Sequence, residues 1–85
     1  MIWNLQVTKP AEKDLRTLPA REQERVKAAL ISLRVDPFGG DVKRLKGKPP
    51  SWRRRVGNYR IVYDLYPEQR LIVVTGILRR TSTTY

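Results

Sequence analysis

The residues best suited to chemistry in this chain are the cations of residues 43–60, a segment with eight lysines or arginines and no acidic residue. A Gly57-Asn58 dipeptide lies within this segment, and residues of strand-forming type flank it on both sides. Such a dipeptide is typical of the two-residue turn of a β-hairpin. Cations that a folded hairpin holds in place can bind phosphate groups through charge-assisted hydrogen bonds. The segment therefore predicts a site for a phosphate-bearing ligand.

A two-residue turn also fixes the register of the two strands that it joins. Arg55 is then expected opposite Arg60, and Arg53 opposite Val62. Because side chains alternate between the two faces of a strand, Arg53, Arg55 and Arg60 should share one face. Three guanidinium groups on one small patch repel one another unless an anion lies among them. We therefore expect this face to bind phosphate, with an ordinary solvated basic face as the alternative.

The opposite face of the same hairpin is apolar and should contact the core. Its members are Trp52, Val56, Tyr59, Ile61 and Tyr63. Arg54 falls on this face as well, so its aliphatic stem must follow the apolar neighbours while its charge reaches an edge. The alternative is that the predicted register is wrong at Arg54.

Further basic residues lie on both sides of the hairpin. Four of them fall in a predicted loop and should make diffuse contacts with a nucleic-acid backbone, unless they are simply solvated: Lys43, Arg44, Lys46 and Lys48. Arg79 and Arg80 follow the last apolar segment, near the terminal Tyr85. Which of these two arginines shares the face of Arg60 depends on the turn at residues 67–70, because a one-residue slip swaps the faces. A frayed basic tail is the alternative for these terminal residues.

Positive charge is concentrated in the second half of the chain. Residues 1–42 hold seven Lys or Arg and six Asp or Glu, a net of +1, whereas residues 43–85 hold eleven and two, a net of +9. Charge confined to one half gives a directional field, which favours a polyanionic partner such as a nucleic acid. A general surplus that only aids solubility does not need this asymmetry.

The composition excludes several kinds of site. The chain has no cysteine and no histidine, so it lacks thiol chemistry and the usual zinc ligands. Two acids in the second half are too few for a typical carboxylate cage around a hard metal ion. We therefore expect no metal and no cofactor. Because no apolar stretch reaches membrane-spanning length and the first residues lack a signal-peptide pattern, we expect a cytoplasmic protein with no membrane partner.

The first half of the chain predicts a strand followed by two helices. Residues 1–7 alternate in the manner of a strand. Thr8 can cap a helix that ends near Leu18, and Pro19 suits the start of a second helix. Apolar residues at helical spacing mark the face of this second helix that should be buried. They are Val26, Ala29, Leu30 and Leu33.

The second half predicts a loop at 47–51 and three strands. The expected strands are 52–56, 59–66 and 71–78, and the last of them is continuously apolar, which is typical of a central strand covered on both faces. The chain shows no repeat and no interdomain linker. Residues 1–85 should therefore form a single α+β domain in the order β-α-α-β-β-β, with a two-helix hairpin packed on a small, mainly antiparallel sheet.

These residues resemble the RelE/ParE superfamily of bacterial toxins from type II toxin–antitoxin systems. The resemblance spans essentially the whole chain, including the order of elements. Its most specific part is the motif G-x-Y-R-x-x-Y from Gly57 to Tyr63, followed by an apolar strand, two arginines and a near-terminal tyrosine. Members of the superfamily are either ribosome-dependent mRNA endonucleases or inhibitors of DNA gyrase.

For the nuclease branch, the resemblance implies cleavage of mRNA in the ribosomal A site by attack of a ribose 2′-OH on the adjacent phosphate. Arg53 and Arg55 fall where the RelE type has basic residues beside the scissile phosphate. Arg60 matches the arginine of the Tyr-Arg pair, and its implied role is to stabilise the charge of the transition state. The resemblance further implies that Arg80 assists the leaving group and that Tyr85 orients the nucleotide.

The nuclease is the preferred reading, and a non-catalytic inhibitor of DNA gyrase is the alternative; a non-toxic, degenerate member is a third. Arg55 replaces a lysine of the nuclease pattern, and an arginine does not release its proton, so the general base is left open. The resemblance implies a cognate antitoxin as a partner, besides mRNA and the ribosome. The basic second half suits a partly acidic antitoxin that covers the arginines.

Overall fold

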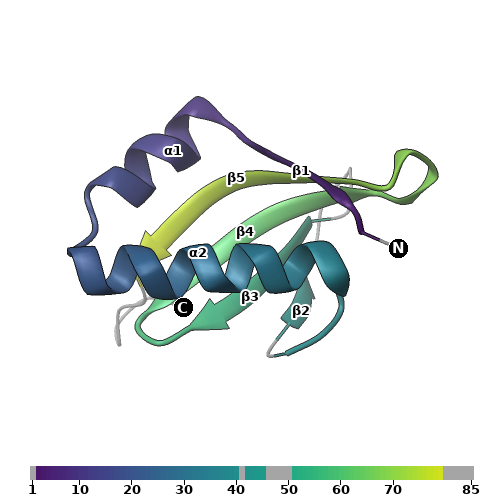
Figure 1. Cartoon of the computed structure of the whole chain (residues 1–85). Coiled ribbons are helices and arrows are strands. Elements are labelled where there is room, and N and C mark those ends of the chain that lie inside the picture. The colour runs from purple at the N-terminus through teal and green to yellow at the C-terminus, as the bar shows by residue number, and fades with distance from the viewer. Residues whose placement is uncertain (1, 41, 46–50, 80–85) are drawn as a thin grey trace.

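The structure of the protein, a computed structural model, describes residues 2–40, 42–45 and 51–79. Its elements are β1 (Asn4–Val7), α1 (Lys9–Arg16), α2 (Ala20–Val35), β2 (Val42–Leu45), β3 (Ser51–Val56), β4 (Tyr59–Tyr66), the 3-10 helix η1 (Pro67–Gln69) and β5 (Leu71–Arg79). The described strands form one sheet in the order β1-β5-β4-β3-β2. β1 runs parallel to β5, and the other neighbouring pairs are antiparallel. The two helices lie over this sheet (Figure 1), so the predicted α+β fold is confirmed.

Strand β2 corrects the prediction that Lys43 and Arg44 lie in a loop. Val42–Leu45 pairs with β3, placing Lys43 opposite Arg53 and Arg44 opposite Trp52. The segment is a strand because Val42 packs against the core and its backbone completes the edge of the sheet. The sequence did not predict this strand because two adjacent cations interrupt the alternation of apolar and polar residues in so short a segment. Both side chains are exposed.

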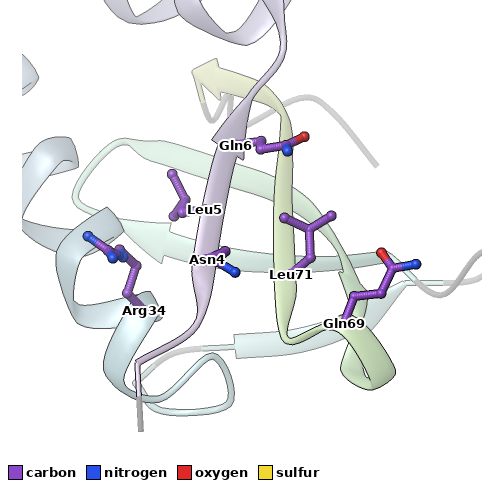
Figure 2. Close-up of a pocket in the computed structure, with 6 residues that line it drawn as sticks. All are labelled: Asn4, Leu5, Gln6, Arg34, Gln69 and Leu71. Atoms are coloured by element: carbon purple, nitrogen blue, oxygen red, sulfur yellow. The ribbon is translucent and has the colours of Figure 1, made fainter.

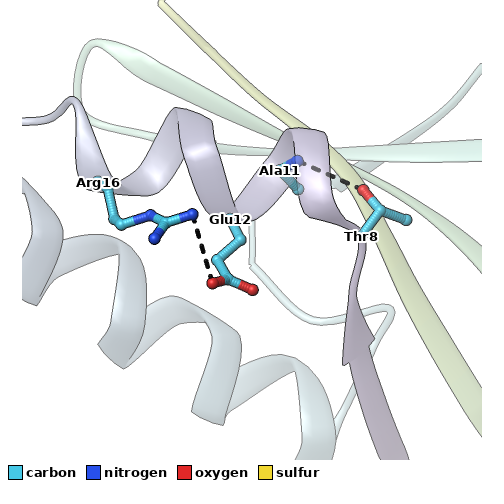
Figure 3. Close-up of polar contacts among 4 residues, drawn as sticks. All are labelled: Thr8, Ala11, Glu12 and Arg16. Carbon is cyan, nitrogen blue, oxygen red and sulfur yellow. Dashed lines mark hydrogen bonds and ion pairs between the residues drawn. The ribbon is translucent and has the colours of Figure 1, made fainter.

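The helical hairpin begins after Thr8, as the sequence indicated, and its first helix ends at Arg16, two residues before the predicted end at Leu18. The Thr8 hydroxyl accepts a hydrogen bond from the amide of Ala11 at 3.3 Å, which caps α1 (Figure 3). An ion pair of 3.5 Å joins Glu12 to Arg16 one turn later, but both side chains are exposed and it contributes little stability. Pro19 caps α2. Within residues 2–40, 42–45 and 51–79, no helix is long and apolar enough to cross a membrane.

The core lies between the helices and one face of the sheet. In β4 every second residue is buried, and the predicted apolar stripe of α2 packs against this face. Tyr63 is fully buried, and its hydroxyl donates a hydrogen bond of 2.7 Å to the carbonyl of Pro37 just beyond α2. Burial raises the pKa of Tyr63 to about 12. The expectation that both faces of β5 are covered is wrong for the described residues, since Leu78 on the second face is 46% exposed.

The outer edge of β5 is covered in two different ways. β1 pairs with it only from Leu71 to Val74. Beyond that point the amide of Ile77 donates to the Asp14 carboxylate at 3.1 Å. Because Asp14 belongs to α1, this helix fixes the part of β5 that leads to Arg79.

Candidate nucleic-acid interface

The β3–β4 hairpin has the register that was predicted from the sequence. Arg55 pairs with Arg60, and Arg53 pairs with Val62. Gly57 in the turn has a φ of 57°, in the left-handed region that favours glycine. The tight turn therefore sets which side chains of the two strands share a face.

Arg53, Arg55 and Arg60 lie on the face of the sheet opposite the helices, and we call these three residues the arginine face. Arg53 lies between two strands, with Lys43 of β2 on one side and Val62 of β4 on the other. Arg53 and Arg60 are half-buried, whereas Arg55 is exposed. Among the described residues, β2 flanks Arg53, and β4 flanks all of β3.

Lys43 adds a fourth cation to the same face. It pairs directly with Arg53 across β2 and β3, so the two side chains point to the same side. Arg44, one residue further, lies on the helix side of the sheet opposite Trp52. The two neighbours that the sequence grouped as backbone contacts are thus divided between opposite faces.

The last strand settles the place of Arg79. β4 and β5 pair Arg60 with Leu78 and Tyr59 with Arg79, so Arg79 shares the helix side of the sheet with the buried Tyr59. A bulge between Val62 and Tyr63 shifts the pairing by one residue. Without that shift, Arg79 would lie on the side of Arg60. The signal for the bulge was an isolated glycine, Gly76, inside a strand pattern.

Arg54 resolves as a long side chain that reaches out from the apolar face. Its backbone pairs with Ile61, as the predicted register requires. Its Nη1 donates to the Ser32 hydroxyl of α2 at 3.1 Å. The guanidinium also lies over Gly40, where an added Cβ would be 3.0 Å from Cζ. The predicted register is therefore correct at Arg54, and its guanidinium group extends out of the core between α2 and β3.

Comparison with known proteins identifies the family. Residues 5–83 match the family model described as "ParE toxin of type II toxin-antitoxin system, parDE". The chain belongs to the ParE toxin family. This confirms the resemblance to the RelE/ParE superfamily that its motif indicated.

Relatives and solved structures agree with this assignment. The toxin is 32% identical over 83 residues to "Putative toxin RelE1" of Methanocaldococcus jannaschii, which covers 94% of this chain and 92% of that protein. The structure is similar to the archaeal RelE–RelB complex of Pyrococcus horikoshii, with a TM-score of 0.86, 24% identity and 98% and 100% of the two chains covered. It is also similar to the RelBE2 complex of Mycobacterium tuberculosis, with a TM-score of 0.81, 26% identity and 94% and 100% covered.

The toxin has one acid on the side of the arginine face that the sequence reasoning did not single out. Asp64 shares that side of β4 with Arg60 and pairs with Ser51 of β3. Its Oδ1 accepts a hydrogen bond of 2.7 Å from the Ser51 hydroxyl. Strand alternation could have identified it, because Asp64 is four residues from Arg60. Among the strand residues that the structure describes, Asp64 is the only acidic residue.

A hollow of about 550 Å³ at the far edge of the sheet is a poorer candidate site. It lies at β1, and the residues that line it are Asn4, Leu5, Gln6, Arg34, Gln69 and Leu71 (Figure 2). β1 and β3 are separated by β5 and β4 in the sheet. A hollow with one arginine among amides and leucines lacks the charge that a phosphate backbone requires.

Four of the residues singled out from the sequence lie outside the described residues. Lys46 and Lys48 precede β3, and Arg80 and Tyr85 follow β5 in the chain. Their contribution to the interface stays a prediction.

Proposed function

We propose that this toxin is a ribosome-dependent endonuclease that cleaves mRNA in the ribosomal A site. The observation that carries the proposal is the arginine face together with Lys43, which brings four cations from three neighbouring strands to one side of the sheet. Arginine donors have the geometry to hold phosphate oxygens in pairs. Similarity to proteins named RelE supports a nuclease rather than another use of this surface.

The proposed reaction is an internal transfer of the phosphoryl group. The ribose 2′ oxygen forms a bond to the adjacent phosphorus, the bond from phosphorus to the 5′ oxygen breaks, and the products end in a cyclic phosphate and a 5′-OH. Negative charge on the phosphoryl oxygens increases towards the transition state. Arg60 and Arg53 are half-buried on paired strands, which place both cations on the side where that charge would be stabilised.

Proton transfer in this reaction requires groups other than the described arginines. An arginine does not accept the 2′-OH proton at neutral pH, because it stays protonated. We propose that Arg80 assists the leaving 5′ oxygen and that Tyr85 orients the nucleotide, with Tyr85 or groups of the ribosomal RNA helping to move the protons. The toxin then acts mainly by positioning the phosphate and by electrostatics.

We further propose that a cognate antitoxin binds this toxin in the cytoplasm and covers the arginine face. The solved relatives include RelE chains in complexes with RelB. A net charge of +9 on residues 43–85 would attract a partly acidic segment. Expression of the toxin alone and beside the neighbouring open reading frame tests this proposal by growth and by co-purification. A toxin that is expressed alone without harm and that captures nothing would contradict it.

The decisive experiment for the nuclease measures cleavage of a translated message by primer extension. Arg60→Ala should lower the cleavage rate by about 10²–10³-fold, since a positioned donor to the transition state is lost. Arg21→Ala is the matched control, because Arg21 is an exposed arginine of α2 on the other side of the molecule. The proposal would be overturned if the message on ribosomes stayed intact when the wild-type toxin is expressed at a level that stops growth.

Inhibition of DNA gyrase is the second candidate function. It is favoured by the description of the matching family, which names parDE, and by Arg55, which stands where the nuclease pattern has a lysine and stays protonated. A supercoiling assay with purified gyrase separates the two functions. Inhibition together with intact message would replace the nuclease proposal with this one.

A further inference from the structure

A second basic site lies on the helix side of the molecule, away from the arginine face. A groove of about 430 Å³ runs between α2 and the end of β3. Arg25, Ala28 and Ser32 line it from α2, and Arg54, Arg55 and Gly57 line it from the hairpin. We call it the helix-side groove.

The local packing holds two of its guanidinium groups in place. Arg25 lies against the turn, and a Cβ at Gly57 would be only 3.1 Å from its Cζ, so the missing side chain makes room for the guanidinium. Arg54 is held by its hydrogen bond to Ser32. Since Ser32 is neutral, this bond orients the guanidinium without cancelling its charge.

The groove has charge, donors and space for an anion. Glu22 contacts Arg25 at 3.6 Å; the Arg25 side chain is 53% exposed and the Glu22 side chain 21%, so this ion pair offsets part of the charge of Arg25. The small side chain of Ala28 and the absence of one at Gly57 leave the groove open between the cations. Converging arginines with space between them fit a phosphate group better than a carboxylate, since phosphate offers more acceptor oxygens.

We propose that the helix-side groove binds a backbone phosphate of the same RNA strand that reaches the arginine face. Arg55 connects the two sites, because it belongs to the arginine face and also lines the groove. The RNA strand then passes Arg55 on its way from one site to the other. The choice of RNA over another polyanion rests on the proposed function, whereas the anion site rests on the groove itself.

The test measures binding of a short fluorescein-labelled oligouridylate to the full chain by fluorescence anisotropy over a series of salt concentrations. Arg25→Gln should weaken binding about tenfold at low salt and lower the slope of log affinity against log salt by about 0.7, the value for one phosphate contact to a single strand. Lys27→Gln is the matched control. It removes the same charge from α2, but Lys27 does not line the groove.

A second pair of variants tests the groove without removing an arginine. Ala28→Glu places a negative charge in the groove and should weaken RNA binding more than Ala28→Gln does, because glutamine fills the same space with nearly the same size and helix propensity but carries no charge. Ala28 is exposed, so both variants should fold. Equal affinities and salt slopes for Arg25→Gln and Lys27→Gln would overturn the proposal. The proposal would also be overturned if Arg25→Gln bound polyglutamate less tightly than wild type but bound RNA equally well. The groove would then bind an acidic protein segment instead of RNA.

The same measurements separate this proposal from the nuclease. A toxin that cleaves translated message, but whose RNA affinity does not depend on Arg25, would refute the groove alone. A toxin whose RNA affinity depends on Arg25, but that leaves message intact, would refute the nuclease and keep the groove as an RNA site.

Discussion

Replacing Tyr63 by phenylalanine tests how the most specific part of the sequence motif supports the site. Tyr63 is fully buried, and its hydroxyl donates to the Pro37 carbonyl at 2.7 Å. Tyr63→Phe removes this bond and leaves a buried carbonyl without its partner. The expected loss in the free energy of unfolding is about 1–3 kcal/mol near neutral pH. For a small domain this is a large share of a total of roughly 5–15 kcal/mol.

The pKa of Tyr63 adds a signature that no other loss of packing would produce. Burial is the main cause of the rise from 10.0 to about 12; nearby Arg54 opposes it and Asp36 adds to it. The folded state therefore favours the neutral phenol. This stabilisation is fully present below the unfolded pKa of about 10 and is lost as pH rises towards 12. At about 1.4 kcal/mol per pH unit, the loss over this interval is on the order of 3 kcal/mol.

Urea unfolding of wild type and Tyr63→Phe, followed as pH is raised, measures this effect directly. The stability gap between the two proteins should narrow by roughly 2–3 kcal/mol between about pH 10 and pH 12. Tyr66→Phe is the matched control, because Tyr66 lies on the same strand but is only half-buried. Other titrating groups cancel in the difference. A gap between wild type and Tyr63→Phe that stays constant across this interval would refute the reasoning.

Two further variants test the parts of the fold that position the arginines. Gly57→Ala forces a Cβ into a left-handed turn and against Arg25, so urea unfolding should show a loss of about 1–2 kcal/mol; a neutral effect would contradict the assigned turn. Asp14→Ala leaves the amide of Ile77 without its acceptor, which should cost about 1–2 kcal/mol and speed hydrogen exchange at that amide. Unchanged exchange there would show that α1 does not hold the end of β5.

The hairpin could be predicted from sequence because local chemistry determines it. A two-residue turn allows few registers, and strand alternation then places Arg53, Arg55 and Arg60 on one side without any knowledge of the rest of the chain. The same rule held for Arg54, whose long side chain extends from the apolar face to Ser32. Short-range rules were sufficient where one turn controlled both strands.

Strand β2 could not be predicted in the same way because its pairing is supplied by a distant partner. Four residues with two adjacent cations carry little alternation of their own, and Val42–Leu45 becomes a strand because β3 offers it an edge. Missing this strand also affected the prediction of the functional site. As a strand residue, Lys43 is placed opposite Arg53 on the arginine face, whereas a loop would have left its position open.

The bulge in β5 shows how one extra residue decides which side chains reach the site. The motif from Gly57 to Tyr63 divides its roles by alternation: Tyr59 and Tyr63 pack in the core, and Arg60 lies on the opposite side. With regular alternation along β5, Arg79 would lie on the side of Arg60. The shifted pairing at the bulge moves it to the side of Tyr59. A backbone irregularity 13 residues along the chain from Val62, where Thr75 donates to the Val62 carbonyl, thus removes one arginine from the arginine face. The side of the sheet on which Arg79 lies is therefore decided at the bulge, and not by the basic composition around it.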